Sequence, residues 1–482
     1  MARTIEAVGE VSASLLRAAV RSRPTLYTRG LSVPAVAPLL AAATVSLLLV
    51  ACQAGSPSRP DSEAEPNPPS SSAPTPSPTL SPTLSPTPSP APSPARSRTA
   101  APEEAHSKRL AGVSTAALNA RLIDAAWDND VDRASRLIRA GADVNAKDDT
   151  EQSAYLISTS EGYLRLLNLT LRHGADVDSK DSYNGTGLIR AAERGHAGVV
   201  GRLLQTDVEV DHVNRLGWTA LHEAIILGED TPSYHDTVRL LAAAGADISL
   251  PSRRDGVLPL QHARNQGFDT AASTLRRAAR ARGINGAQAR TRLLRAARQG
   301  RADAVVVALR AGAPLETRDG NRRTPLLLTA IHDRVDVARL LVALGADPDR
   351  QDFRDDSAWL VTGVTGSVAM LETLLPAHPD LALENRFGGT SLIPASERGH
   401  VGYVRRVVRT DIEVNHVNDL GWTALLEAVI LGDGSRPYQR IVRILLRAGA
   451  DPTIADDDGV TAPEHARDRG HQAVARILRG AS

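Results

Sequence analysis

From about residue 110 to the C-terminus, apolar residues recur three and four positions apart in short runs that often end before a glycine. Leucine pairs such as Leu240-Leu241 and Leu340-Leu341 close several of these runs. This spacing predicts short amphipathic helices, each ended by a glycine in the left-handed conformation. Aromatic residues make up only 3% of the chain, which also favours helices over sheets. We therefore expect an all-α fold for this region.

The helices are expected to recur as a regular unit. A Gly-Ala-Asp tripeptide begins at Gly141 and again at Gly174, about 33 residues later, and it returns at Gly245, Gly345 and Gly449. After most of these tripeptides a threonine opens the next unit, where it can cap free backbone N–H groups. One such unit cannot bury its apolar face alone, so neighbouring units must stack.

Two motifs within the units resemble those of the ankyrin-repeat family. Residues 217–224 resemble the family's opening motif, and residues 191–196 resemble its turn between the two helices of a repeat. The resemblance implies an ankyrin-repeat solenoid of about eleven repeats. We expect the repeats to begin near Ala120, Ala154, Thr186, Thr219, Leu258, Thr291, Thr324, Ala358, Thr390, Thr423 and Thr461.

A longer period lies above the first. Residues 212–221 return with small changes at 416–425, about 204 residues later. This offset indicates a tandem duplication, with a first ankyrin-repeat module over 108–284 and a second over 285–482. An extra repeat and a junction are expected around residues 279–301, and the glycines at 283 and 286 could form a hinge there.

The N-terminal segment reads as a targeting signal. An apolar run of about a dozen residues begins at Pro38 and ends in Leu49-Val50-Ala51-Cys52, which resembles the lipobox of bacterial lipoproteins. The resemblance implies a signal peptide over 1–52, a diacylglyceryl group on Cys52 and a location at the extracytoplasmic face of the cell membrane. The alternative is an uncleaved signal anchor over residues 31–50.

Residues 53–107 are almost wholly proline, serine, threonine and alanine. Such a segment has too little apolar surface to offset the entropy of folding, so we expect a disordered linker. In an extended polyproline conformation it could span on the order of 150 Å.

Several function classes are excluded by what the sequence lacks. The formal net charge of +1 gives no reason to expect nucleic acid as a partner. No P-loop, metalloprotease motif or nucleophile elbow is present, and the single cysteine is assigned to lipid. We therefore expect no enzyme activity, cofactor, metal or small-molecule substrate. His196, His222 and His400 are expected to form structural hydrogen bonds.

The resemblance implies that loops between repeats and the first helices bind a protein partner. The exposed candidates in these loops are Tyr183, Asn184, Arg215, Arg253, Arg254, Arg322, Arg323, Phe353, Arg354, Arg386 and Phe387. Charge reversal at Arg322 and Arg323 is expected to weaken partner binding without unfolding. Two related insertions, 228–236 and 432–440, lengthen a turn between helices and place Tyr234 and Tyr438 in the same repeats as Trp218 and Trp422. These four aromatics either anchor a partner or pack within the repeat.

Nine arginines and no acidic residue fall within residues 276–301. This run either contacts anionic lipid headgroups or wall polymers, or forms a solvated helix face.

The sequence thus favours an extracytoplasmic, membrane-tethered ankyrin-repeat protein that binds another protein. One alternative is an inhibitor or immunity-type protein that blocks a toxin or hydrolase, and another is an enzyme or wall-remodelling factor with an unrecognised site. Fold class alone does not choose among them.

Overall fold

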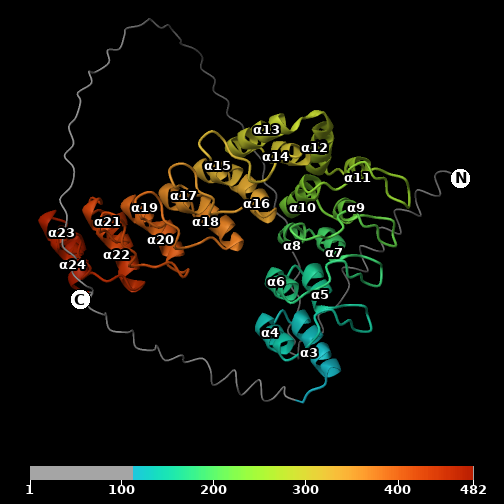
Figure 1. Cartoon of the computed structure of the whole chain (residues 1–482), viewed down its shortest axis with the longest axis horizontal. Helices are drawn as coiled ribbons and strands as arrows, with labels where there is room; N and C mark the ends of the chain where they lie inside the picture. The colour runs from blue at the N-terminus through green and yellow to red at the C-terminus, as the bar shows by residue number, and fades with distance from the viewer. Residues whose placement is uncertain (1–111, 481–482) are drawn as a thin grey trace, which may run out of the picture. The chain divides into compact units, whose positions relative to one another are not determined.

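The computed structural model describes residues 112–480 (Figure 1). The signal peptide, Cys52 and the linker expected from the sequence lie outside these residues. The described part is all helical, without a β-strand, and it falls within one unit of the chain. None of its helices is both long and apolar enough to cross a membrane. The all-α fold is therefore confirmed.

The helices form eleven successive antiparallel pairs within residues 112–480, as the repeat period predicts. The first helices of the pairs are α3 (Thr115–Trp127), α5 (Ala154–Ser160), α7 (Gly187–Glu193), α9 (Ala220–Ile226), α11 (Pro259–Asn265), α13 (Gly286–Gln299), α15 (Pro325–Ile331), α17 (Ala358–Thr365), α19 (Leu392–Glu397), α21 (Ala424–Ile430) and α23 (Ala462–Asp468). The second helices are α4 (Val131–Arg139), α6 (Leu164–Arg172), α8 (Ala197–Leu203), α10 (Pro232–Ala243), α12 (Asp269–Ala278), α14 (Ala302–Arg310), α16 (Val335–Ala343), α18 (Val368–Leu374), α20 (Val401–Val407), α22 (Arg436–Arg447) and α24 (Gln472–Arg479). Two short 3-10 helices, η1 (Ala279–Gly283) and η2 (Leu375–Ala377), follow α12 and α18.

Local sequence sets where these helices begin and end. The side chains of Thr186, Thr324 and Thr423 each accept a hydrogen bond from the backbone N–H three residues ahead, as expected for helix N-caps. Glycines with positive φ follow six of the second helices, at positions 141, 174, 245, 312, 345 and 449, for example with φ of 102° at Gly141. After α18, which is not followed by such a glycine, His378 takes the same left-handed conformation, with φ of 54°.

Two of the expected repeat starts are wrong. Helix α13 begins at Gly286, where Asn285 caps it, so Thr291 lies inside the helix. Helix α3 is capped by Ser114, several residues before Ala120. These two first helices have 13 and 14 residues, whereas most others have seven. Neither has a threonine at its N-cap, as α7, α9, α15, α21 and α23 do.

The turns formed by the two insertions are shorter than the sequence suggested. Helix α10 begins at Pro232 and helix α22 begins at Arg436, and each has 12 residues. The second half of each insertion therefore extends a helix, and only residues 227–231 and 431–435 remain as the turn.

The eleven pairs divide into five, one and five. An offset of about 204 residues superposes α3–α12 on α15–α24, since Trp218 and Trp422 precede α9 and α21, and Tyr234 and Tyr438 lie in α10 and α22. The pair α13–α14 is the extra repeat, without a counterpart in either set.

The array bends at the extra repeat. Each first helix packs against the next one along the chain, except that α11 and α13 are not packed in this way. The second helices stay packed through the bend, and α10 additionally contacts α14 and α16, while α8 contacts α16. Two arms result, α3–α12 and α13–α24, which meet through their second helices (Figure 1).

The apolar core follows the array. One cluster of buried side chains runs from Tyr155 in α5 to Leu478 in α24 and passes through both arms. A smaller cluster, from Leu118 to Leu169, lies between the first two repeats. The bend therefore does not divide the core.

Candidate partner-binding surface and the cleft between the arms

The loops between repeats form fingers of one construction. In the finger at 319–324, one side-chain oxygen of Asp319 accepts the backbone N–H groups of Asn321 at 2.9 Å and Arg323 at 3.0 Å. Seven other fingers repeat this arrangement, from Asp148, Asp181, Asn214, Asp352, Asn385, Asn418 and Asp456. The residue three positions after this side chain has positive φ, which tightens the turn. The tip residues therefore project away from the helices.

Large apolar side chains are exposed at these tips. Phe353 is 65% exposed, Tyr183 56%, Leu420 51% and Phe387 50%. An arginine guanidinium lies over each ring, at 5.4 Å for Arg322 over Phe353 and 4.4 Å for Arg386 over Phe387. Because aromatic and arginine side chains dominate the energetics of protein interfaces, these tips have the composition of a binding surface.

On the second arm the tips form one continuous row, here called the fingertip row, of Arg322, Phe353, Arg386, Phe387 and Leu420. Backbone hydrogen bonds join the first two fingers, from Phe353 N–H to Asn321 O at 3.2 Å, and the last two, from Asp419 N–H to Phe387 O at 3.0 Å. Between the middle two fingers the link is a side-chain bond, from Gln351 Nε2 to Glu384 O at 2.7 Å. The row is therefore a fixed surface rather than a set of independent loops.

A cavity of about 460 Å³ opens beside Phe353, between two fingers of the second arm and helices α15 and α17. Ile331, Val361 and Val364 provide its apolar wall, while Arg323 and Asp352 lie on its polar side. An apolar side chain of a partner could enter here next to the exposed ring.

The structure separates Arg322 from Arg323. Arg322 is exposed, with φ of 63°, and lies over Phe353. Arg323 is half-buried, and its guanidinium pairs with Asp319 at 2.8 Å, the same carboxylate that holds the finger. Charge reversal at Arg323 would therefore disturb the finger itself, so only Arg322 suits the test of binding without unfolding. Arg215 lies between these cases, since it is exposed but donates to Ser182 O at 2.6 Å.

Tyr234, Tyr438 and Trp218 lie as the second alternative from the sequence describes, packed within the repeats. The hydroxyl of Tyr234 donates to Glu193 O and that of Tyr438 to Glu397 O, each at 2.9 Å. Each ring packs against the glycine in the turn between the two helices of the preceding repeat, Gly195 for Tyr234 and Gly399 for Tyr438. Trp218 is buried, with 8% of its surface exposed. These aromatics close the lengthened turns from inside. Trp422, the counterpart of Trp218, is half-buried and remains partly accessible.

The three histidines have the structural role expected of them. His196 Nε2 lies 3.0 Å from Ser160 O, and His400 Nε2 lies 3.1 Å from Val364 O. His222 Nδ1 lies 2.9 Å from Thr219 Oγ1 and completes the cap of α9. Within residues 112–480, no group of three or more histidine, cysteine, aspartate or glutamate side chains is arranged to hold a metal ion.

Sequence reasoning missed a pair of buried carboxyl groups. Glu223 is 1% exposed and accepts a hydrogen bond from Asn214 Nδ2 at 2.6 Å, and its duplicate Glu427 accepts one from Asn418 Nδ2 at 3.0 Å. Burial, assisted by the neighbouring Glu193, raises the pKa of Glu223 to about 8. Burial and Glu397 raise the pKa of Glu427 to about 7. The recurring glutamate at both duplicated positions was the available signal.

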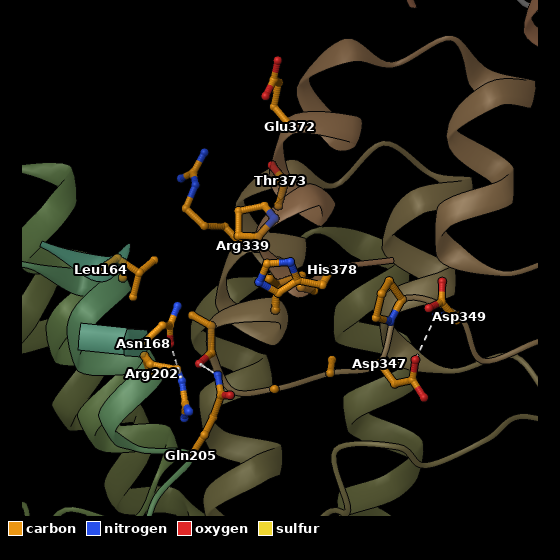
Figure 2. A pocket seen from close by; sticks show the side chains of 18 of the residues that line it. Leu164, Asn168, Arg202, Gln205, Arg339, Asp347, Asp349, Glu372, Thr373 and His378 are labelled. Carbon is orange, nitrogen blue, oxygen red and sulfur yellow. Dashed lines mark hydrogen bonds between the residues drawn. The ribbon is translucent and has the colours of Figure 1, made fainter. Parts of the chain in front are cut away.

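The sequence also gave no sign of the cleft between the arms. A cavity of about 1010 Å³ lies between α6 and α8 of the first arm and α16, α18 and residues 376–378 of the second. Figure 2 shows Leu164, Asn168, Arg202 and Gln205 on one side and Arg339, His378 and Glu372 on the other. The side chains are of mixed charge, so the cleft does not select one class of ligand.

Close backbone approach holds the arms together at the base of this cleft. Gln205 Nε2 donates to Ala343 O at 2.9 Å, across 138 residues of sequence. Gly201 makes the approach possible, because a Cβ at that position would lie 2.7 Å from both Cβ and O of Ala343. Arg310 adds hydrogen bonds to Ala242 O at 3.1 Å and Ala246 O at 2.7 Å.

The stacked helix pairs, with their fingers along one edge, define a helical repeat protein. Ankyrin repeats are recognised in three segments of the array: a family model of three ankyrin repeats matches residues 155–252 and 361–456, and a single-repeat model matches residues 321–353. Neither model describes a catalytic family.

Known relatives share parts of the array. The ankyrin repeat protein YahD of Escherichia coli (strain K12) is 43% identical over 121 residues, which are 25% of this chain and 60% of YahD. A mitochondrial disaggregase of Bos taurus is 39% identical over 67 residues, which are 14% of this chain and 9% of that protein. The chain thus spans less than two thirds of either relative. A crystal structure of an ankyrin repeat domain from Acinetobacter baumannii is 42% identical, with 39% of this chain and 96% of that domain covered and a TM-score of 0.38.

Proposed function

We propose that this ankyrin-repeat protein binds a protein partner through the fingertip row of its second arm, while a lipid on Cys52 holds it at the extracytoplasmic face of the cell membrane. The observation that carries the binding proposal is the exposure of Phe353 and Phe387, each beneath an arginine and on fingers that a hydrogen bond from Gln351 to Glu384 O links. Burial of exposed aromatic surface of this kind against a partner removes it from water and thereby stabilises the complex.

The proposed tether rests on residues 49–52 and on the composition of residues 53–107. A diacylglyceryl group provides two acyl chains, which suffice for stable anchoring where one does not. A proline-rich spacer would let the repeats reach a partner away from the bilayer.

Replacing both Phe353 and Phe387 with alanine is expected to lower partner affinity by about thirtyfold or more, because two interface anchors are lost. The wild-type chain is used to capture its partner from the source cells, the partner is identified by mass spectrometry, and the purified pair is then titrated by calorimetry.

The matched control is Leu431→Ala, which removes a side chain of similar exposure, 49%, from a turn outside the fingertip row. Equal affinity of the double variant and the wild type would remove the fingertip row from consideration. Helicity and melting temperature should be the same in all three proteins, since all three side chains are exposed.

Replacing Cys52 with alanine is expected to move the protein out of the lipid-modified membrane fraction, because the thiol that would carry the acyl chains is gone. Cell fractionation together with incorporation of labelled fatty acid measures both effects. If Cys52→Ala stays in the membrane fraction, the uncleaved signal anchor over residues 31–50 replaces the lipoprotein proposal.

A further inference from the structure

The densest positive charge in the chain gathers on the extra repeat. Residues 276–301 carry nine arginines and no carboxylate, although the whole chain has a formal net charge of only +1. The structure places six of these arginines around two adjoining cavities rather than along a single helix face.

The larger cavity, about 660 Å³, lies between the first helices α13 and α15 and is here called the arginine pocket. Its cationic side chains come from α13, from the turns after α13 and α15 and from one finger; they are Arg295, Arg298, Arg301, Arg323 and Arg334. Asp319 is the one carboxylate in the lining.

A second cavity of about 240 Å³ continues from the first and shares Arg295, Gln299 and Arg301 with it. It adds Arg277, Arg280 and Arg292, with Asp303 as its one acidic side chain. The two cavities therefore form one positively charged depression.

The acidic side chains nearby are already paired. Asp319 is bound by Arg323 at 2.8 Å, and Asp303 is bound by Arg239 at 3.1 Å and by Thr274 at 2.9 Å. Among the described residues, no carboxylate lies within ion-pairing distance of Arg295, Arg298 or Arg301. Their charges are therefore not compensated from within this part of the chain.

Parts of the pocket are fixed by close packing. Gly300 has φ of 70°, and a Cβ there would lie 2.8 Å from Cδ of Arg334, so the glycine leaves room for this side chain. Arg334 Nε then donates to Arg298 O at 3.3 Å. Burial together with Arg298, Arg334 and Arg323 lowers the pKa of His332 in the same lining, as a positive local potential requires.

We propose that the arginine pocket binds a small, multiply charged phosphate compound. The planar guanidinium group donates two parallel hydrogen bonds to a phosphoryl group, and several arginines in one concave site concentrate the field on such an anion. The five arginines of the pocket face only one carboxylate. Their combined charge is therefore matched better by a ligand with several phosphoryl charges than by a ligand with a single phosphodiester. This inference does not depend on the protein partner proposed above.

Isothermal titration of the full chain in nonionic detergent with sodium tripolyphosphate tests this site. The double substitution Arg295→Gln with Arg298→Gln is expected to weaken tripolyphosphate binding about tenfold or more, since two charge-assisted contacts are lost. The control, Arg436→Gln with Arg440→Gln, removes the same charge from exposed positions of α22 and should leave affinity within about twofold, because distant charges are screened.

Absence of tripolyphosphate binding to the wild type, or equal binding by both double variants, would overturn the proposal. Glycerophosphoglycerol serves as a soluble phospholipid headgroup in a parallel titration. Tighter binding of tripolyphosphate supports a free, multiply charged phosphate compound, whereas tighter binding of the headgroup, which carries a single phosphodiester, would contradict the proposal in favour of a lipid surface. If hexaglutamate binds as tightly as tripolyphosphate and with the same dependence on Arg295 and Arg298, the pocket recognises acidic peptide and phosphoryl recognition is wrong.

Discussion

Replacing Glu223 with glutamine is expected to stabilise the folded array at neutral and alkaline pH by on the order of 3 kcal/mol. The pKa of this carboxyl group rises from its ordinary value of 4.5 to about 8 in the fold. The folded state therefore binds the proton more tightly than the unfolded state does. Its contribution to stability is fully present below about pH 4.5 and is lost as the pH rises through about 8. Glutamine keeps the oxygen that accepts from Asn214 and does not ionise.

Denaturant unfolding between pH 5 and pH 9 measures the effect. The stability of the wild type should fall across this window relative to Glu223→Gln, with the two proteins nearly equal at pH 5. The other charged groups around Glu223, which are Glu193, Arg190 and Asp181, stay the same in both proteins.

The duplicate offers a matched control. Glu427→Gln should show the same trend with a smaller gain, because the pKa of Glu427 rises only to about 7. If the free energies of unfolding of wild type and Glu223→Gln change with pH in parallel, ionisation of Glu223 does not destabilise the fold and the prediction is wrong.

Replacing Gly201 with arginine is expected to force the two arms apart and to destabilise the junction by about 1–3 kcal/mol. A side chain at this position has no space, because Cβ alone would lie 2.7 Å from Ala343. Helix α20 of the second arm carries Arg405 at the equivalent position, so an arginine there is compatible with the helix itself. The distance between spin labels at exposed positions 172 and 369, on opposite sides of the cleft, reports the opening.

Both label sites are introduced as cysteines in the Cys52→Ala background, so that only two thiols react. Gly198→Arg is the control, since a Cβ at Gly198 in the same helix meets only Leu164, at 3.9 Å. An unchanged label distance in Gly201→Arg would show that contact between α8 and α16 does not hold the arms.

The sequence predicted the repeat number and most helix starts because these depend on local signals. Threonine caps and left-handed glycines act within a few residues, and the 33-residue period repeats them. The starts near Ala120 and Thr291 were wrong because α3 and α13 lack this threonine and are about twice as long.

The site was predicted less completely, since it depends on contacts across the fold. Phe353 and Phe387 lie at finger tips as expected, because one aspartate or asparagine organises each finger locally. The inward position of Tyr234 is set by Glu193 O in the preceding repeat, and the cleft is set by residues 138 positions apart. The burial of Glu223 likewise needs the neighbouring repeat. Periodicity within one repeat does not specify such contacts.

The contact between α8 and α16 changes how the array should assemble and come apart. A linear repeat array has only nearest-neighbour contacts, so folding can start at any repeat and fray from either end. Here Gln205 and Ala343 close a loop of 138 residues around three whole repeats, α9–α14. Closing a loop of that length has an entropic cost on the order of 4 kcal/mol, and its long-range contacts slow folding. The middle repeats thus form and dissolve as one cooperative block, while the first two repeats, with a core cluster of their own, are free to open first.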